Sequence, residues 1–160
     1  MEKINIIVVE DQREVLHAIT KDLAALEEFI NVEECESAAE ALSLMNSLSS
    51  QGDYIGLIIS DHVMPDKSGV DFLTDVQRDK RFEGTRKILL TGLATHADTI
   101  NAINKAGIDH YISKPWKSKD LIDNVRILLT GYIFEKGIPY EDHLRWMDKQ
   151  TVFERLRQEG

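Results

Sequence analysis

The chain has 160 residues, of which 42% are hydrophobic and 29% charged, the composition of an ordinary globular domain. Its 28 acidic residues outnumber its 19 basic ones, and the formal net charge of -9 disfavours a nucleic-acid-binding domain because such a surface repels phosphate backbones. One cysteine, Cys35, excludes a disulfide framework, and the lack of an ~18-residue apolar run or a signal-peptide pattern predicts a cytoplasmic protein without a membrane segment.

The first fifty residues predict a strand, a helix, a strand and a helix. Ile4–Val9 is a short β-branched run that is apolar on both faces, as a central parallel strand would be. Apolar residues at helical spacing follow over 15–26, and residues 31–36 are a weaker strand candidate. Ser-Ala-Ala-Glu at 37–40 matches a capping box and predicts a helix to residue 48.

The same alternation continues to residue 130. Hydrophobic runs and helical periodicity, with Gly107 as a helix-ending residue, define the remaining segments. They are a strand at 54–60, a helix around 70–76, a strand at 87–91, a helix at 98–106, a strand at 108–113 and a helix at 117–129.

Strands separated by helices predict an α/β fold. The pattern favours a doubly wound, five-stranded parallel sheet with helices on both faces and right-handed crossovers. This domain would occupy residues 1–130. In open sheets of this kind, ligands bind beyond the carboxyl ends of the strands, so the residues at those ends are the candidates for function.

Acidic, hydroxyl and lysine side chains follow four of the five predicted strands. They are Glu10 and Asp11 after the first strand, Asp61 after the third, Thr91 at the end of the fourth and Lys114 after the fifth. Carboxylates ~4 Å apart repel by about 4 kcal/mol per pair at an effective dielectric near 20, so a cation is needed among them. Mg²⁺ with oxygen ligands fits, and the lysine and hydroxyl would suit a phosphoryl group, which predicts a phosphoryl-acceptor site.

Four motifs resemble the receiver domain of two-component response regulators, which includes chemotaxis-type single-domain regulators. They are IIVVED at 6–11, IISDHVMPDKSG at 58–69, LLTG at 89–92 and YISKP at 111–115, and the resemblance covers about residues 3–130. It implies that Asp61 takes a phosphoryl group from the phosphohistidine of a histidine kinase or phosphotransfer protein. The chain would then be a signalling switch for a downstream output protein or domain, and not an enzyme.

The resemblance also implies roles for single residues of the site. Asp11 would bind Mg²⁺ directly, Glu10 would act through water, and Asp61 and the backbone carbonyl of Val63 would complete the protein ligands. The switch residues would be Thr91 and Tyr111, and Lys114 would bind the phosphoryl group. Glu10 is a modest departure, because aspartate is also common at that position.

Three alternative functions fit these residues less well. A haloacid-dehalogenase-type hydrolase needs a second acid two residues beyond the nucleophile, and here that position is Val63. A flavodoxin-like cofactor binder would want a hydroxyl- and glycine-rich first loop, whereas residues 10–14 are Glu-Asp-Gln-Arg-Glu. A phosphorylation-independent pseudo-receiver has no physical need for this repulsive cluster of acids.

Residues 131–160 predict a linker followed by an amphipathic helix over 140–158. This segment would be a dimerising helix, a helix folded back on the domain, the start of an output domain that the chain lacks, or a loosely ordered linker. If it packs, its largest apolar surfaces are Trp146 and Phe153.

The lifetime of an acyl phosphate on Asp61 depends on side chains that hold the attacking water. Val63 and Leu93 are apolar and cannot orient that water, which predicts slow self-dephosphorylation.

Overall fold

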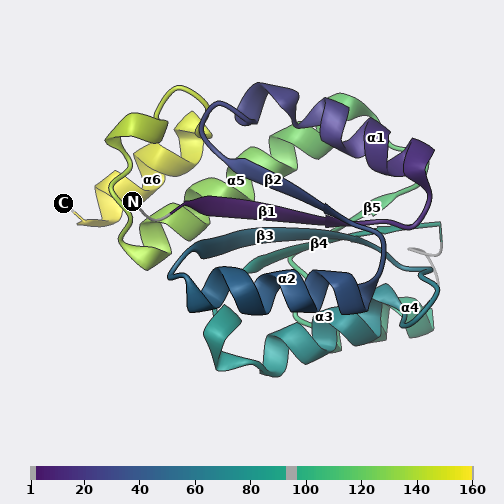
Figure 1. The fold of residues 1–160 in the computed structure, drawn as a ribbon. Helices are drawn as coiled ribbons and strands as arrows, with labels where there is room; N and C mark the ends of the chain where they lie inside the picture. Colours follow the sequence, from purple (N-terminus) through teal and green to yellow (C-terminus); the bar gives the residue numbers. More distant parts are fainter. Residues whose placement is uncertain (1–2, 93–96, 160) are drawn as a thin grey trace.

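A computed structural model describes residues 3–92 and 97–159 of the chain and shows one parallel sheet between two layers of helices (Figure 1). The strands are β1 (Ile4–Val9), β2 (Asn31–Cys35), β3 (Tyr54–Asp61), β4 (Arg86–Thr91) and β5 (His110–Ser113). The helices are α1 (Arg13–Asp22), α2 (Ala38–Ser50), α3 (Gly69–Arg78), α4 (Ala97–Lys105), α5 (Ser118–Lys136) and α6 (Lys149–Glu159). Short 3-10 turns cover 24–26, 80–82 and 141–143.

The sheet has the doubly wound topology that the sequence predicts. Its five strands lie in the order β2-β1-β3-β4-β5, and all of the pairings are parallel. Side chains of α1 and α5 form one core cluster on one face, and side chains of α2, α3 and α4 form a second on the other. The strand order reverses between β1 and β3, so the carboxyl ends of these two strands flank the crevice where such folds bind ligands.

Every predicted strand is present, with each end within two residues of its expected position. The central strands β1 and β3 are buried along almost their whole length, which is why they read as continuous apolar runs. The predicted cap is also confirmed, since the Ser37 hydroxyl accepts a hydrogen bond from the Glu40 N–H at 3.1 Å. Two further N–H groups of this helix, at Ala38 and Ala39, are bound by the Asp66 carboxylate from the loop after β3.

The last helix of the sheet domain is longer than predicted. It does not end near Leu129 but continues to Lys136, where Gly137 (φ 68°) adopts the left-handed conformation that closes it. Buried Tyr132 and Ile133 extend its apolar face, so packing outweighs the poor helix propensity of Gly131. The boundary expected near residue 130 therefore falls inside α5.

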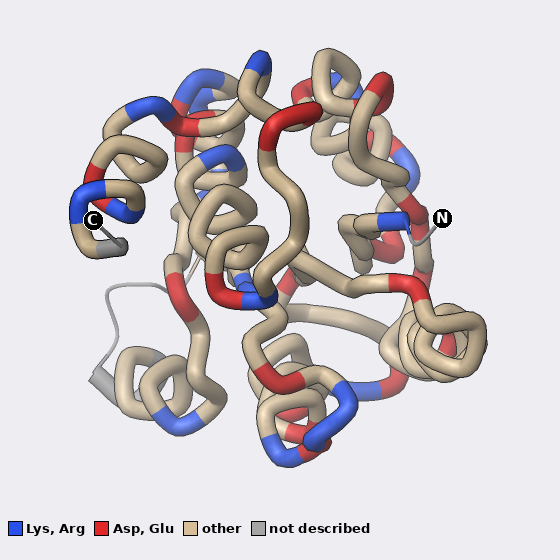
Figure 2. The backbone as a smooth tube through the Cα atoms, turned by 90° about the vertical axis from the view of Figure 1, so that its left-hand side faces the viewer, with Lys and Arg blue, Asp and Glu red and all other residues tan. Residues whose placement is uncertain are grey.

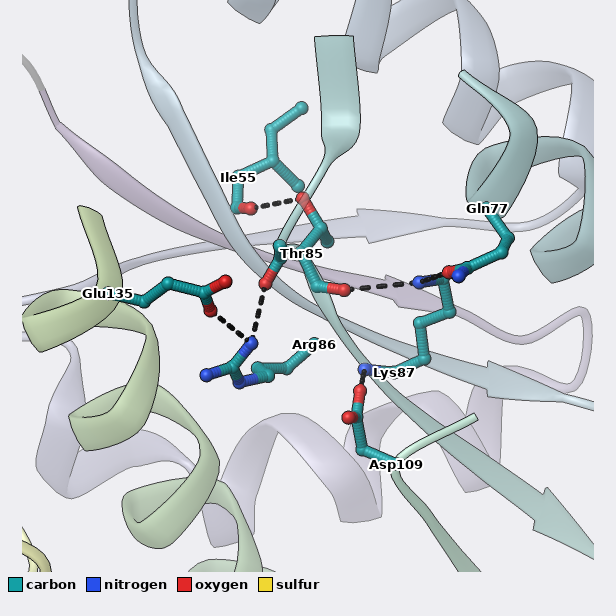
Figure 3. Close-up of polar contacts among 8 residues, drawn as sticks. Ile55, Gln77, Thr85, Arg86, Lys87, Asp109 and Glu135 are labelled. Atoms are coloured by element: carbon teal, nitrogen blue, oxygen red, sulfur yellow. Dashed lines mark hydrogen bonds and ion pairs between the residues drawn. The ribbon is translucent and has the colours of Figure 1, made fainter. Parts of the chain in front are cut away.

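A group of polar contacts (Figure 3) fixes the amino end of β4. The predicted site lies at the other end of the strands. The Lys87 ammonium is buried and donates to the Gln77 side-chain oxygen at 2.7 Å and to the Thr85 carbonyl at 3.2 Å, and its burial lowers the pKa of Lys87. Arg86 pairs with Glu135 at 2.6 Å. These contacts tie α3 and α5 to β4, which is a structural role.

The segment after α5 folds back on the sheet domain. Trp146, Met147 and Val152 are buried in the cluster formed by α1 and α5, and Asp148 donates its N–H to the Thr130 hydroxyl at 3.0 Å. The expectation for Trp146 is confirmed, but that for Phe153 is wrong because its side chain is 58% exposed. Residues 144–147 are turns and a bend and α6 begins only at Lys149, so no continuous helical period joins the two aromatic residues.

The folded-back tail lies at the amino ends of the strands (Figure 1). Viewed from that end, basic and acidic positions are interspersed over α6 and the neighbouring helices (Figure 2). Among the described helices, none combines the length and the apolar character needed to cross a bilayer.

Acidic pH should weaken the docking of this tail. The Trp146 indole N–H donates to Nδ1 of His143 at 3.1 Å, which requires that nitrogen to be unprotonated, and burial lowers the pKa of His143 although Asp142 opposes the shift. Because the folded state favours the neutral ring, its stabilising contribution is complete above the ordinary pKa of ~6.5 and is lost as the pH falls below it. We expect the melting temperature to fall between pH 7.5 and pH 5 more steeply in the wild type than in His143→Gln, and equal falls would contradict this.

Candidate functional site

Asp61 is the central group of the site. It ends β3 and is only 6% exposed, because β1 and β4 flank its strand. Its Oδ1 accepts a hydrogen bond from the His62 N–H at 2.9 Å and lies 2.6 Å from the ammonium of Lys114. A carboxylate held in this way presents its other oxygen, Oδ2, for reaction or for a metal.

Glu10 lies beside Asp61 and is fully buried. Its Oε1 accepts from the Gln12 N–H at 3.3 Å, whereas the buried Oε2 has no hydrogen-bond donor among the described residues and lies 3.6 Å from the Lys114 ammonium. Burial, with a further contribution from Asp61, raises the pKa of Glu10 to about 7, and Lys114 opposes this shift. Burial therefore outweighs the nearby lysine in setting the pKa of this carboxyl group.

The carboxylates of Glu10, Asp11 and Asp61 together form a candidate cation site. Each offers one oxygen, and these oxygens lie within 4.8 Å of one another. Asp11 is exposed while the other two are buried, which leaves the cluster open on one side. Hard oxygen ligands, an open side for waters and the orphaned Glu10 Oε2 all fit Mg²⁺.

Lys114 and Thr91 complete the cluster from the neighbouring strands. The backbone N–H of Lys114 donates to the Thr91 carbonyl at 3.1 Å, which joins the ends of β4 and β5. Thr91 is 2% exposed at the end of β4. The structure thus brings the predicted acids, hydroxyl and lysine to the same edge of the sheet.

The other three predicted residues are an exposed tyrosine, a valine in a loop and a leucine that the structure does not describe. Tyr111 lies on β5 with 42% of its surface exposed and its ring stacked against His110 at 6.3 Å between centroids. Val63 lies in the loop after β3 with its side chain 71% exposed, and the metal-binding role of its carbonyl stays a prediction. Leu93 falls outside the described residues.

Gly69 shapes the site, a role that the sequence reasoning did not assign to it. Its N–H donates to the His62 carbonyl at 2.8 Å, which closes the loop after β3. A Cβ at this position would overlap the Asp61 carbonyl oxygen and lie 2.9 Å from the His62 Cα. The sequence did contain an indication of this role. Glycine has a low helix propensity, so a glycine at the start of a predicted helix indicates that the position has no room for a larger residue.

We expect Gly69→Ala to destabilise the fold by about 1–3 kcal/mol, because the overlapping atoms are backbone and cannot move aside. Chemical denaturation would measure this loss. Gly92→Ala is the matched control, since no described atom lies within 4 Å of a Cβ built there. Equal stability of the Gly69 variant and the wild type would show that the loop adapts freely.

Comparison with known proteins identifies the family to which the fold belongs. The chain matches the family model of the response regulator receiver domain over residues 6–126. The chain belongs to this receiver-domain family. The acids, the lysine and the hydroxyl at the carboxyl edge all lie within the matched residues.

Curated relatives of this receiver domain include both long and short proteins. It is 32% identical over 153 residues to the hydrogenase transcriptional regulatory protein HoxA of Cupriavidus necator, covering 96% of this chain and 29% of HoxA. It is 31% identical to the transcriptional regulatory protein CpxR of Escherichia coli K12, covering 78% of this chain and 48% of CpxR. The chain thus spans less than half the length of these relatives. The chemotaxis protein CheY1 of Helicobacter pylori 26695 is 30% identical, with 78% of this chain and 95% of CheY1 covered.

Solved structures show the same receiver fold. The signal receiver domain of an HD domain-containing protein from Pseudomonas fluorescens Pf-5 superposes with a TM-score of 0.73 at 26% identity, covering 87% of this chain and 96% of that one. A CheY-like receiver domain from Methanospirillum hungatei JF-1 gives 0.70 at 25% identity, covering 84% of this chain and 99% of that one.

Proposed function

We propose that this receiver domain is switched by phosphorylation of Asp61 in a two-component signalling pathway. The observation that carries the proposal is the 2.6 Å contact between the Lys114 ammonium and Asp61 Oδ1, within a cluster of three carboxylates. A lysine held against an acceptor carboxylate can move onto the oxygens of an incoming phosphoryl group. The family membership of the chain supports the same role.

The phosphoryl donor is a phosphohistidine of a sensor histidine kinase or of a phosphotransfer protein. A carboxylate oxygen of Asp61 attacks the phosphorus, so a new O–P bond forms while the P–N bond breaks. The departing imidazole takes a proton from solvent. Lys114 neutralises the phosphoryl oxygens, and because such transfers depend mainly on positioning and charge, the chain needs no general base for this step.

Mg²⁺ would be held by Asp11, Asp61 and the Val63 carbonyl, with Glu10 acting through water. When bound, it supplies positive charge that offsets the carboxylates and the phosphoryl oxygens. The site residues would contribute in separate ways: the acids after β1 and at the end of β3 would bind the cation, and the lysine after β5 would bind the phosphoryl group.

The switch runs through Thr91 and Tyr111. Phosphorylation draws the Thr91 hydroxyl toward the phosphoryl group, which opens space for the exposed Tyr111 ring to turn inward. Such a switch needs one local charge change and an element with two arrangements. The surface near β5 would then present a different face to a downstream output protein or domain.

The chain would act as a cytoplasmic switch and not as an enzyme, because it takes up one phosphoryl group and passes on a change of shape. Longer relatives such as HoxA and CpxR have names that describe transcriptional regulation, so an output domain is one downstream partner class to test. For dimerisation through the C-terminal helix, the exposed apolar side chains are Phe153 and Leu156.

Acetyl phosphate with Mg²⁺ tests the proposal, with intact-protein mass spectrometry as the readout. We expect one acid-labile, hydroxylamine-sensitive phosphoryl group, which is absent in Asp61→Asn. Asp71→Asn is the control, since Asp71 is an exposed acid in the first turn of α3 and should leave the modification unchanged. No modification of the wild type would favour a phosphorylation-independent interaction module.

A further inference from the structure

The loop between β5 and α5 contacts α1 through a directional hydrogen bond. The indole N–H of Trp116 donates to Oδ2 of Asp22 at 2.9 Å, although the two residues are 94 positions apart. Trp116 follows Lys114 by two residues, and Asp22 is the last residue of α1. The contact therefore connects the segment that carries the site lysine to a helix outside the site.

The chemistry of the two groups makes this contact specific. An indole nitrogen can only donate, and the partly buried Trp116 ring packs against the core cluster of α1 and α5, so its N–H needs a nearby acceptor. A carboxylate at the carboxyl end of a helix faces the negative end of the helix dipole. The Trp116 N–H offsets that unfavourable position of Asp22, and a hydrogen bond to a charged acceptor is among the stronger kinds.

The contact is the second of two hydrogen bonds that hold the chain on either side of the Lys114 side chain. On one side, the Lys114 N–H donates to the Thr91 carbonyl at 3.1 Å, which fixes the end of β5. On the other side, the chain passes through Pro115 to Trp116, where the Asp22 contact fixes it. A lysine side chain has four rotatable bonds, so the 2.6 Å approach of its ammonium to Asp61 depends on a backbone held at both sides.

We propose that Trp116 and Asp22 are positioning residues that hold Lys114 in place for the phosphoryl group on Asp61. This inference rests on the proposed function. Without the contact, the loop after Lys114 is held less firmly, and the ammonium loses part of its approach to the phosphoryl oxygens. The carboxylates of the cation site come from the ends of β1 and β3, so losing the contact removes no Mg²⁺ ligand and should not weaken Mg²⁺ binding.

Beryllofluoride, a tetrahedral mimic of an aspartyl phosphoryl group, tests the proposal through binding alone. Its affinity at saturating Mg²⁺ is measured by ¹⁹F NMR for Asp22→Ala, Trp116→Phe and the double variant, and Mg²⁺ affinity is measured separately by calorimetry. We expect each single change to weaken beryllofluoride binding roughly 3- to 10-fold, the range for losing part of a hydrogen bond to a charged group. The double variant should be no weaker than the singles, because both remove the same contact.

Rescue and control variants separate positioning from a general loss of structure. Asp22→Asn keeps an acceptor oxygen and should recover most of the beryllofluoride affinity, whereas Mg²⁺ affinity should not fall in any of these variants. Asp123→Ala is the matched control, since it removes an exposed pair with Lys119 on the first turns of α5 and should change nothing. Unchanged beryllofluoride affinity, additive losses in the double variant or a parallel loss of Mg²⁺ affinity would each overturn the proposal.

Lys114→Ala separates failure of this inference from failure of the proposed function. If Lys114→Ala weakens beryllofluoride binding and the Asp22 and Trp116 variants do not, the positioning role is wrong and the function stands. If Lys114→Ala has no effect either, the lysine does not contact the phosphoryl group, and both proposals fall.

Discussion

Asp11→Ala is expected to abolish Mg²⁺-dependent phosphorylation of Asp61, with a loss of about 100-fold or more at millimolar Mg²⁺ and no loss of fold. The variant lacks one of the three carboxylates whose oxygens lie within 4.8 Å of one another, so the cation loses its exposed ligand. Loss of groups that merely orient a metal ligand already reduces metal affinity 10- to 100-fold, and a direct ligand should matter at least as much.

The same variant should be slightly more stable than the wild type when Mg²⁺ is absent. Removing one of three clustered negative charges relieves repulsion, and because Asp11 is exposed we expect a gain of only about 0.5 kcal/mol in the free energy of unfolding. Calorimetric Mg²⁺ titration and urea denaturation measure the two effects. Glu14→Ala, an exposed acid in the first turn of α1, is the control. Tight Mg²⁺ binding by Asp11→Ala would refute the assignment of the site.

Trp146→Ala should lower the free energy of unfolding by about 3 kcal/mol, which corresponds to a fall of about 6–12 °C in melting temperature. Trp146 is 4% exposed in the cluster shared with α1 and α5, and its indole N–H is bound to His143. Phosphorylation of Asp61 should persist below the melting temperature, because the tail lies at the amino ends of the strands and the site lies beyond their carboxyl ends (Figure 1).

Phe153→Ala provides the matched comparison within the same tail. Its ring is 58% exposed, so truncation should change the free energy of unfolding by less than about 0.5 kcal/mol. Thermal melts of the two variants, read at the same pH, decide between the folded-back tail and a loosely attached one. Similar small effects of both changes would show that Trp146 does not hold the tail in solution.

The sequence by itself determined the sheet and which side chains meet at its carboxyl edge. Runs such as Ile4–Val9 can be read directly because a central parallel strand is buried on both faces and leaves a continuous apolar signature. Once the strands are placed, parallel pairing forces their carboxyl ends to one edge. Asp61, Lys114 and Thr91 therefore meet there whatever the details of packing, which is why they were predicted together.

Local patterns were insufficient where contacts between distant segments decide the outcome. The predicted helix ends at residue 129, yet α5 continues through Gly131 because Tyr132 and Ile133 gain burial against the sheet. Trp146 and Phe153 are both large apolar residues at positions of the same predicted helix. The turn before α6 separates them, so that Trp146 is buried and Phe153 is exposed.

The contact between Trp116 and Asp22 is also beyond sequence reasoning, because it joins a loop to a helix 94 positions away. Burial and hydrogen-bond partners of this kind depend on where the layers meet in space. The hydrophobic pattern of a strand and the side chains at its end depend on residues that are neighbours in the sequence, so the sequence determined the sheet and its acidic edge. Which side chains support that edge, and how the tail packs, was decided only by the tertiary structure.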